Sequence, residues 1–203
     1  MHNQTKIQLS SFEMDLLNNS AWILTKNQIV KKAQGLLERV QENMTAYIQQ
    51  HSNSFSPVVL AISPKISKGE NYKGLPWLML DYPRYFDKEN VFAIRTMFWW
   101  GNFFSTTLHL SGKYKMEHAD RIIHAYSALC KKDFYTCINT IQWEHHLDKE
   151  NYIPVKDLSQ QDFASQVRER SFIKLSQKIS FSQWDDAISL LTENFTQITN
   201  WLD

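Results

Sequence analysis

The sequence predicts an α+β fold in which an antiparallel sheet of about four to five strands is flanked by N-terminal and C-terminal helices. Eight of the ten glycines and prolines fall between positions 57 and 112, so the middle of the chain is rich in turns. The segments on either side carry apolar residues at helical spacing. The chain has 203 residues, 43% of them hydrophobic, which is enough for a sizeable core, and we expect one domain over residues 1–203.

The N-terminal segment predicts a long helix over about 26–50, preceded by a short helical turn around 11–17. Thr25 can cap the long helix, and Gln28 stands three residues further on, which is the spacing of a capping box. A helix of this length can cross a whole face of a sheet. Its predicted core-facing stripe consists of Ile29, Ala33, Leu36, Leu37, Val40, Met44, Tyr47 and Ile48.

The turn-rich middle predicts the strands of the sheet. Runs of apolar, β-branched and aromatic residues occupy 57–62, 75–80, 91–100 and 103–110. A further strand is expected within 134–141. The segment 64–74, which contains three lysines and two glycines, is interpreted as a solvated loop.

The C-terminal part of the chain predicts helices again. One helix is expected over about 115–131 and others within about 160–202, where Ser159 can act as a cap. The polar segment 142–157 between them is interpreted as a long loop. The last helix is predicted from an apolar stripe formed by Trp184, Ala187, Ile188, Leu191, Phe195, Ile198 and Leu202.

The Gly-Asn pair between the third and fourth strand candidates predicts a tight hairpin with a two-residue turn. Because alternate strand residues point to opposite faces, this register places Arg95 beside Trp99 and Phe104. It places His109 on the opposite face, together with Trp100. If the aromatic hairpin is exposed, it can dock on a protein partner or on a second copy of the chain, so a protein-interaction module is one hypothesis.

Arg95 is the first candidate for a ligand-binding residue. A guanidinium among apolar side chains requires an anionic partner, which is either a carboxylate of the protein or the anionic group of a ligand. Our first hypothesis is therefore a protein that binds a small anionic ligand on the sheet. Arg95 with Trp99 and Phe104 defines one pocket, and His109 with Trp100 defines a rival pocket on the other face.

Two further groups of residues are candidates for function. Asp81 and Arg84 flank a Tyr-Pro turn, where they either bracket a cleft or stabilise the turn itself. His145 and His146 follow Glu144 in the long loop, and acid–base chemistry by these side chains would make the protein an enzyme. Adjacent histidines point apart in an extended chain and the sequence has no spaced His/Cys framework, so we expect neither a metal site nor a cofactor.

Composition argues against two classes of partner. The 22 Lys and Arg residues nearly balance the 21 Asp and Glu residues, so a formal charge of +1 favours neither nucleic acid nor an anionic membrane surface. The apolar run 91–100 is interrupted by Arg95 and is shorter than a membrane span. The N-terminus lacks the features of a signal peptide, and Cys130 and Cys137 form no disulfide framework, so we expect a cytoplasmic protein.

Overall fold

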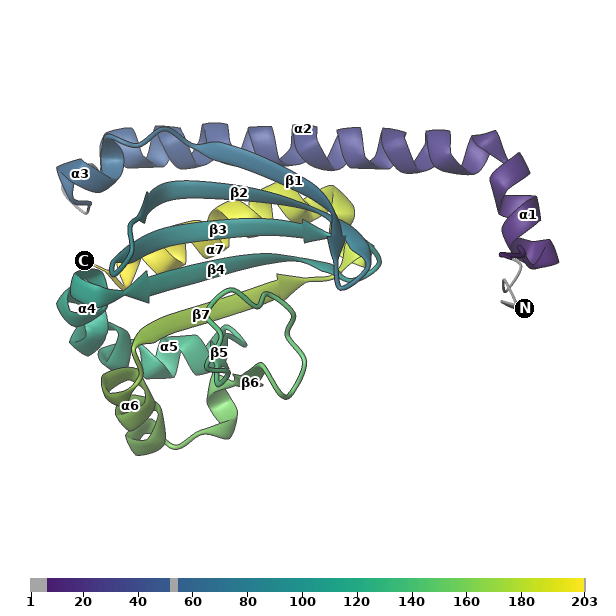
Figure 1. Ribbon diagram of the computed structural model, residues 1–203. Coiled ribbons are helices and arrows are strands. Elements are labelled where there is room, and N and C mark those ends of the chain that lie inside the picture. The colour runs from purple at the N-terminus through teal and green to yellow at the C-terminus, as the bar shows by residue number, and fades with distance from the viewer. Residues whose placement is uncertain (1–6, 52–54, 203) are drawn as a thin grey trace.

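The computed structural model describes residues 7–51 and 55–202, which form helices and a seven-stranded sheet (Figure 1). Neighbouring strands are antiparallel and follow the order β1-β2-β3-β4-β7-β5-β6. The strands are β1 (Lys65–Tyr72), β2 (Leu75–Phe86), β3 (Val91–Trp99), β4 (Phe103–Ser111), β5 (Tyr135–Cys137), β6 (Tyr152–Pro154) and β7 (Phe172–Ile179). The helices are α1 (Ser11–Asn18), α2 (Ser20–Gln50), α3 (Pro57–Leu60), α4 (Gly112–His124), α5 (Tyr126–Lys131), α6 (Gln160–Glu169) and α7 (Ala187–Asn200), with 3-10 turns η2 (Val155–Asp157) and η3 (Phe181–Asp186).

One face of the sheet carries the main hydrophobic core and is covered by α2 and α7 (Figure 1). Leu80, Ile94 and Leu108 come from three neighbouring strands, and their side chains have no exposed surface. Leu37 of α2 and Phe195 of α7 belong to the same cluster and are equally buried. Most of the apolar stripe predicted for the N-terminal helix is therefore the face that α2 buries against the sheet.

The opposite face of the sheet, which we call the polar face, carries charged and hydroxyl side chains between two small apolar clusters. Directly paired residues of antiparallel strands lie on the same face. The strand register aligns Asp81, Arg95, Thr107 and Ser176 in one row and Ala93, His109 and Lys174 in the next row. Residues 138–151, which connect β5 to β6 and which we call the covering loop, contact this face.

The antiparallel α+β class is confirmed, but the sheet has seven strands rather than four to five. Residues 57–62 were expected to form a strand and instead begin the short helix α3, because Pro57 stands at its first position, where a missing N–H costs nothing. β1 lies in the segment expected to be a solvated loop, and β6 lies in the expected long loop. β7 lies within the region 160–202 where helices were expected, in the segment 172–181 whose sequence fits either a helix or a strand.

The boundaries of the long helices also differ from the expectation. α2 begins at Ser20 rather than near residue 26, and its cap is Asn19, whose side chain accepts a hydrogen bond from the Trp22 N–H. Thr25 is therefore inside the helix and is not its cap. Ser159 does cap α6, as predicted, by accepting a hydrogen bond from the Asp162 N–H. No helix within residues 7–51 and 55–202 is both long enough and apolar enough to cross a membrane.

The β3–β4 hairpin turns through three residues, Trp100 to Asn102, rather than two. Trp99 pairs with Phe103 in this register, and the Asn102 N–H donates to the Trp99 carbonyl oxygen at 3.0 Å. Gly101 has a φ of +72°, a conformation that glycine adopts without steric cost. The predicted register was therefore wrong by one residue, and a shift by one residue moves every side chain of a strand to the other face relative to its partner.

This register changes which candidate residues share a face. Arg95 and His109, expected on opposite faces of the hairpin, lie together on the polar face. Phe104, expected beside Arg95, lies on the core face and has no exposed surface. Trp100, expected beside His109, lies in the turn and packs against the edge of the main core. The two rival pockets are thus replaced by one polar face.

Candidate functional site

The guanidinium of Arg95 is bound by a carboxylate of the protein. Asp81 is the direct partner of Arg95 in the β2–β3 ladder, so both side chains project from the same place on the polar face. Arg95 Nε donates to Asp81 Oδ1 at 2.6 Å, and Nη2 donates to Oδ2 at 3.3 Å. The two side chains are only 12% and 10% exposed. The ion pair, one of the two alternatives that the sequence left open, is present.

Arg95 still has one donor that the protein leaves unused. Its Nη1 is buried and has no hydrogen-bond partner among the described residues. Aromatic rings lie on the guanidinium, with its central carbon 5.5 Å from the ring centre of Phe86 and 5.9 Å from that of Trp143. Trp143 belongs to the covering loop, so an aromatic side chain from this loop lies over the charged group.

His109 lies one row along the polar face from Arg95. Its side chain has no exposed surface, and its Nε2 lies 3.0 Å from the amide oxygen of Gln142 in the covering loop. Its Nδ1 is buried without a hydrogen-bond partner within the part of the chain that the structure describes. Burial, and then the nearby charges of Lys174 and Arg95, lower the pKa of His109 to about 3. The imidazole is therefore neutral at neutral pH.

Lys174 is the direct partner of His109 on β7, and it is only 1% exposed. Its Nζ donates to the backbone carbonyl oxygen of Glu144 and lies 5.5 Å from the ring centre of Tyr152. Among the described residues it forms no ion pair with a carboxylate. Burial, with a smaller contribution from Arg95, lowers the pKa of Lys174 to about 7.

The sequence did not single out Lys174. The segment around it fits both a helix and a strand, and the helical interpretation hides its position on a sheet. Read as a strand, the segment alternates Lys174 and Ser176 with Ile173 and Leu175, which is the period-2 pattern of a sheet with one polar and one apolar face. That alternation is the signal that could have placed a lysine on the polar face.

The covering loop is fastened to the sheet by Tyr72 of β1. The Tyr72 hydroxyl donates to Glu144 Oε2 at 2.9 Å and accepts from the backbone N–H groups of His145 at 2.6 Å and His146 at 3.0 Å. Burial is the main cause that raises the pKa of Tyr72 to about 12, so the hydroxyl keeps its proton. Near the end of the loop, Asn151 accepts from the Ile138 N–H through its carbonyl oxygen at 2.8 Å.

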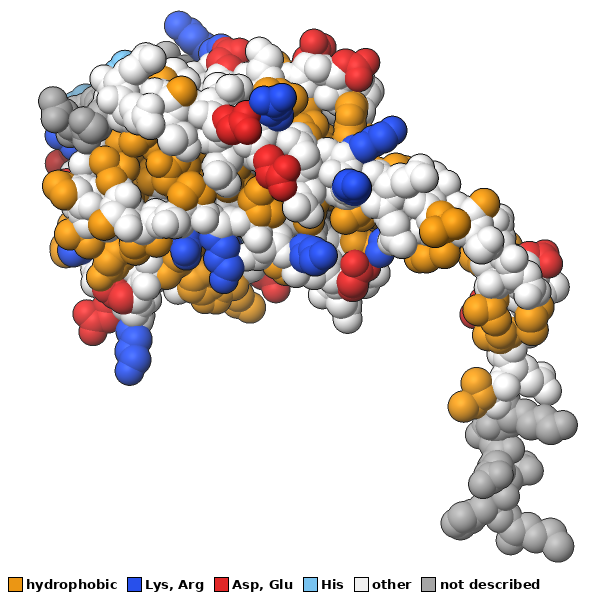
Figure 2. All heavy atoms as spheres, turned by 90° about the horizontal axis from the view of Figure 1, so that it is seen from above, with side chains coloured by type: hydrophobic (Ala, Val, Ile, Leu, Met, Phe, Trp, Pro, Cys, Tyr) orange, Lys and Arg blue, Asp and Glu red, His pale blue; other side chains and the backbone are white. Residues whose placement is uncertain are grey.

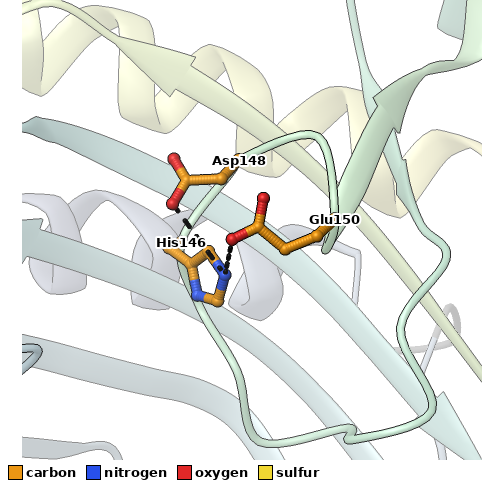
Figure 3. Close-up of side chains that lie close together, drawn as sticks. All are labelled: His146, Asp148 and Glu150. Atoms are coloured by element: carbon orange, nitrogen blue, oxygen red, sulfur yellow. Dashed lines mark ion pairs between the residues drawn. The ribbon is translucent and has the colours of Figure 1, made fainter.

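The two histidines of the covering loop have different surroundings. Burial, and then the charge of Lys174, hold the pKa of His145 well below its usual range, so this side chain is neutral at neutral pH. His146 is 3% exposed and turns its Nδ1 toward Glu144 Oε2, at 3.2 Å, and toward the Tyr72 hydroxyl, at 3.0 Å. His145 therefore lies near the polar face, whereas His146 lies at the outer side of the loop with Asp148 and Glu150 (Figure 3).

The remaining candidates lie away from Arg95, His109 and Lys174. Trp99 is 5% exposed and packs in the apolar cluster with Met79 and Met97, and its indole N–H donates to the Tyr72 carbonyl oxygen at 3.3 Å. Arg84 lies beyond the irregularity in β2, where its Nε donates to the Ser63 carbonyl oxygen at 2.9 Å. Asp81 and Arg84 therefore do not bracket a common cleft: Asp81 joins the polar face and Arg84 fixes a neighbouring loop.

Five hollows on the surface of the described residues have volumes of about 320 to 640 Å³, and none of the five is lined by Arg95, His109 or Lys174. Trp143 lies over part of the polar face, with its ring centre 5.3 Å from that of His109. No protein-family model, curated protein or solved structure matches the chain.

Proposed function

We propose that the protein binds a small anionic ligand, such as a phosphate ester or a carboxylate, between the polar face and the covering loop. The observation that supports the proposal is the buried ammonium group of Lys174, which has no carboxylate partner among the described residues. Arg95 adds a second cation to the same face, and Asp81 is its bound counter-charge. The polar face therefore contains one buried positive charge more than its carboxylate can balance.

An anion at this place would satisfy groups that the protein leaves without partners. A buried charge without a counter-charge is costly, and a buried donor or acceptor without a hydrogen bond adds to that cost. Lys174 Nζ and Arg95 Nη1 would each offer a donor to an oxygen of the ligand. A phosphate or carboxylate group presents several acceptors, which suits such a set of donors.

Access to this site would depend on the covering loop. Trp143 lies over Arg95 and His109, yet its side chain is 48% exposed. A side chain that is half in solvent has few contacts to lose when it swings out. In this proposal Trp143 acts as a lid, and the ligand takes the place of its ring.

The proposal is tested by calorimetric titration of the protein with inorganic phosphate and with succinate at pH 6.5, where Lys174 is mostly charged. Lys174→Met is expected to weaken the binding of the preferred anion about tenfold to a hundredfold, because a charged hydrogen bond is lost. Lys178→Met is the matched control, since Lys178 lies on the same strand and face but is exposed. Equal affinity in wild type and Lys174→Met, or no binding of either anion by wild type, would contradict the proposal.

A second candidate function is self-association, and it is supported by the N-terminal arm, which we define as residues 7–24. The arm projects away from the sheet, and apolar side chains gather on its surface (Figures 1 and 2). The aromatic hairpin that the sequence suggested as a docking surface is a weaker basis, because Trp99 and Phe104 are buried. The exposed apolar residues of the arm are Ile7, Leu9, Phe12, Met14, Leu17, Trp22, Ile23 and Leu24.

Two arms side by side would each cover the apolar surface of the other, as a two-fold symmetric contact requires. Sedimentation velocity at rising concentration is expected to show twice the 24.0 kDa mass of the chain. The double variant Leu17→Ser/Trp22→Ser should remain a monomer. Met116→Ser is the control, because Met116 is 74% exposed on α4, outside the arm. A wild-type protein that stays monomeric at the highest concentration would rule out this function.

A further inference from the structure

We propose that His146, Asp148 and Glu150 of the covering loop bind a divalent cation of the zinc class. The three residues alternate along the loop, and their side chains converge on one point at its outer side (Figure 3). One ligand atom of each lies within 4.8 Å of the others. This site is separate from the proposed anion site and does not depend on it.

The separations between these ligand atoms suit an ion between them. His146 Nε2 lies 3.7 Å from Glu150 Oε1 and 4.0 Å from Asp148 Oδ2. These distances are too long for hydrogen bonds. Two ligands of a tetrahedral ion with bonds of about 2.0–2.2 Å are roughly 3.4 Å apart. The carboxylates are 60% and 69% exposed, so a small rotation of either side chain closes the remaining gap.

The buried face of His146 fixes the ring for this role. Its Nδ1 lies 3.2 Å from Glu144 Oε2, and a carboxylate can only accept a hydrogen bond. The Tyr72 hydroxyl, 3.0 Å from the same nitrogen, donates its proton to Glu144 and therefore does not donate to Nδ1. When the ring carries one proton, Glu144 therefore places that proton on Nδ1. A histidine that donates through one nitrogen to a carboxylate and faces a metal ion with the other is a recurrent arrangement in metal sites.

This assignment leaves the lone pair of Nε2 directed at two carboxylates. The side chain of His146 is 4% exposed, and Nε2 has no hydrogen-bond partner within the described part of the chain. A buried imidazole nitrogen and two carboxylate oxygens that face one another repel unless a positive charge lies between them. Among the described residues, Lys73 is the cation that forms an ion pair with these carboxylates: its Nζ is 3.9 Å from Asp148 Oδ2, and both groups of the pair are exposed, so it contributes little.

The set of ligands indicates the class of ion and leaves it accessible. One imidazole nitrogen and two carboxylate oxygens suit Zn²⁺ and similar first-row divalent ions, whereas Mg²⁺ and Ca²⁺ favour oxygen ligands throughout. Three protein ligands leave at least one coordination position to water or to another molecule. The exposed carboxylates place that position at the surface of the covering loop.

The experiment is a calorimetric titration of the full chain with Zn²⁺ alone, after treatment with a chelator. We expect one ion per chain in the micromolar range or tighter, and a loss of affinity of about tenfold or more in Asp148→Asn and in Glu150→Gln. Both residues are exposed, so these variants should fold. Asp120→Asn is the control, because Asp120 is an 80% exposed carboxylate on α4, outside the covering loop.

Two further variants test the role of Glu144 and the independence of this site from the anion site. Glu144→Gln removes the carboxylate that orients His146 and is expected to weaken Zn²⁺ binding about tenfold to a hundredfold. Lys174→Met should leave Zn²⁺ binding unchanged, so that failure of the anion proposal does not affect this one. Wild type that takes up no Zn²⁺, or Asp148→Asn and Glu150→Gln variants that bind it as wild type does, would overturn the proposal.

Discussion

Replacement of Arg95 by methionine is expected to lower the free energy of unfolding by about 3–5 kcal/mol, because it leaves a buried carboxylate without its counter-charge. Asp81 is 10% exposed at its side chain, and both of its oxygens accept hydrogen bonds from Arg95. No other cation of the described residues forms an ion pair with Asp81. The measurement is urea unfolding at pH 7, with the free energy extrapolated linearly to water.

A double variant distinguishes the loss of the ion pair from a general loss of packing. Arg95→Met combined with Asp81→Asn removes both charges, and we expect it to recover most of the lost stability, since an ion pair and a neutral replacement are often nearly equal in the interior. Arg84→Met, on the same strand as Asp81, is expected to change the stability by less than about 1 kcal/mol. A double variant as unstable as Arg95→Met alone would show that the unpaired charge of Asp81 is not the cause of the lost stability.

The helices could be predicted from the sequence because their apolar stripes are long. The stripe of α2 continues over several turns, and six of its eight predicted members are buried in the core. β7 has eight residues and fits a helical stripe as well as an alternating strand, so local pattern cannot decide between them. α3 has only four residues, and its Val-Val-Leu run is typical of a strand, so only the tertiary structure reveals a helix there.

The sequence contains a signal for the register of the β3–β4 hairpin, but its turn residues alone do not reveal that register. A Gly-Asn pair fits a two-residue turn, but it also fits a three-residue turn with glycine in the left-handed region. The observed register pairs Phe98 with Phe104 and Ile94 with Leu108, so apolar residues oppose apolar residues. The predicted register paired Phe98 with a serine. Burial of one continuous apolar face selects the longer turn.

The candidate site could be predicted only in parts. Arg95, Asp81 and His109 were each recognisable as polar residues in or beside apolar strands, but the sequence does not state which strands pair. The fourth member, Lys174, comes from a strand 65 positions beyond His109, and the contact between Tyr72 and His146 joins residues 74 positions apart. Such long-range contacts follow from the whole sheet order, which no local pattern encodes.

Replacement of Lys174 by methionine is expected to stabilise the protein in acid and neutral solution, because it removes a buried cation that the described residues do not balance. The pKa of Lys174 is lowered to about 7 from an ordinary value of 10.5. Between these two values the unfolded chain binds a proton that the folded protein has released, so the free energy of unfolding of wild type rises with pH. Below pH 7 the cost of the buried charge is fully present and is on the order of a few kcal/mol.

The advantage of Lys174→Met should therefore be largest at about pH 6 and shrink as the pH rises toward 10. The remaining pH dependence is shared by both proteins: Tyr72, whose pKa is about 12, lowers the stability of each above pH 10, because the unfolded tyrosine loses its proton first. Lys178→Met, which removes an exposed charge from the same face, should follow wild type at every pH. Urea unfolding of the three proteins at pH 6, 8 and 10 measures this difference. An advantage that does not change with pH would show that Lys174 keeps its proton on folding, and would contradict the expected release of that proton between pH 7 and pH 10.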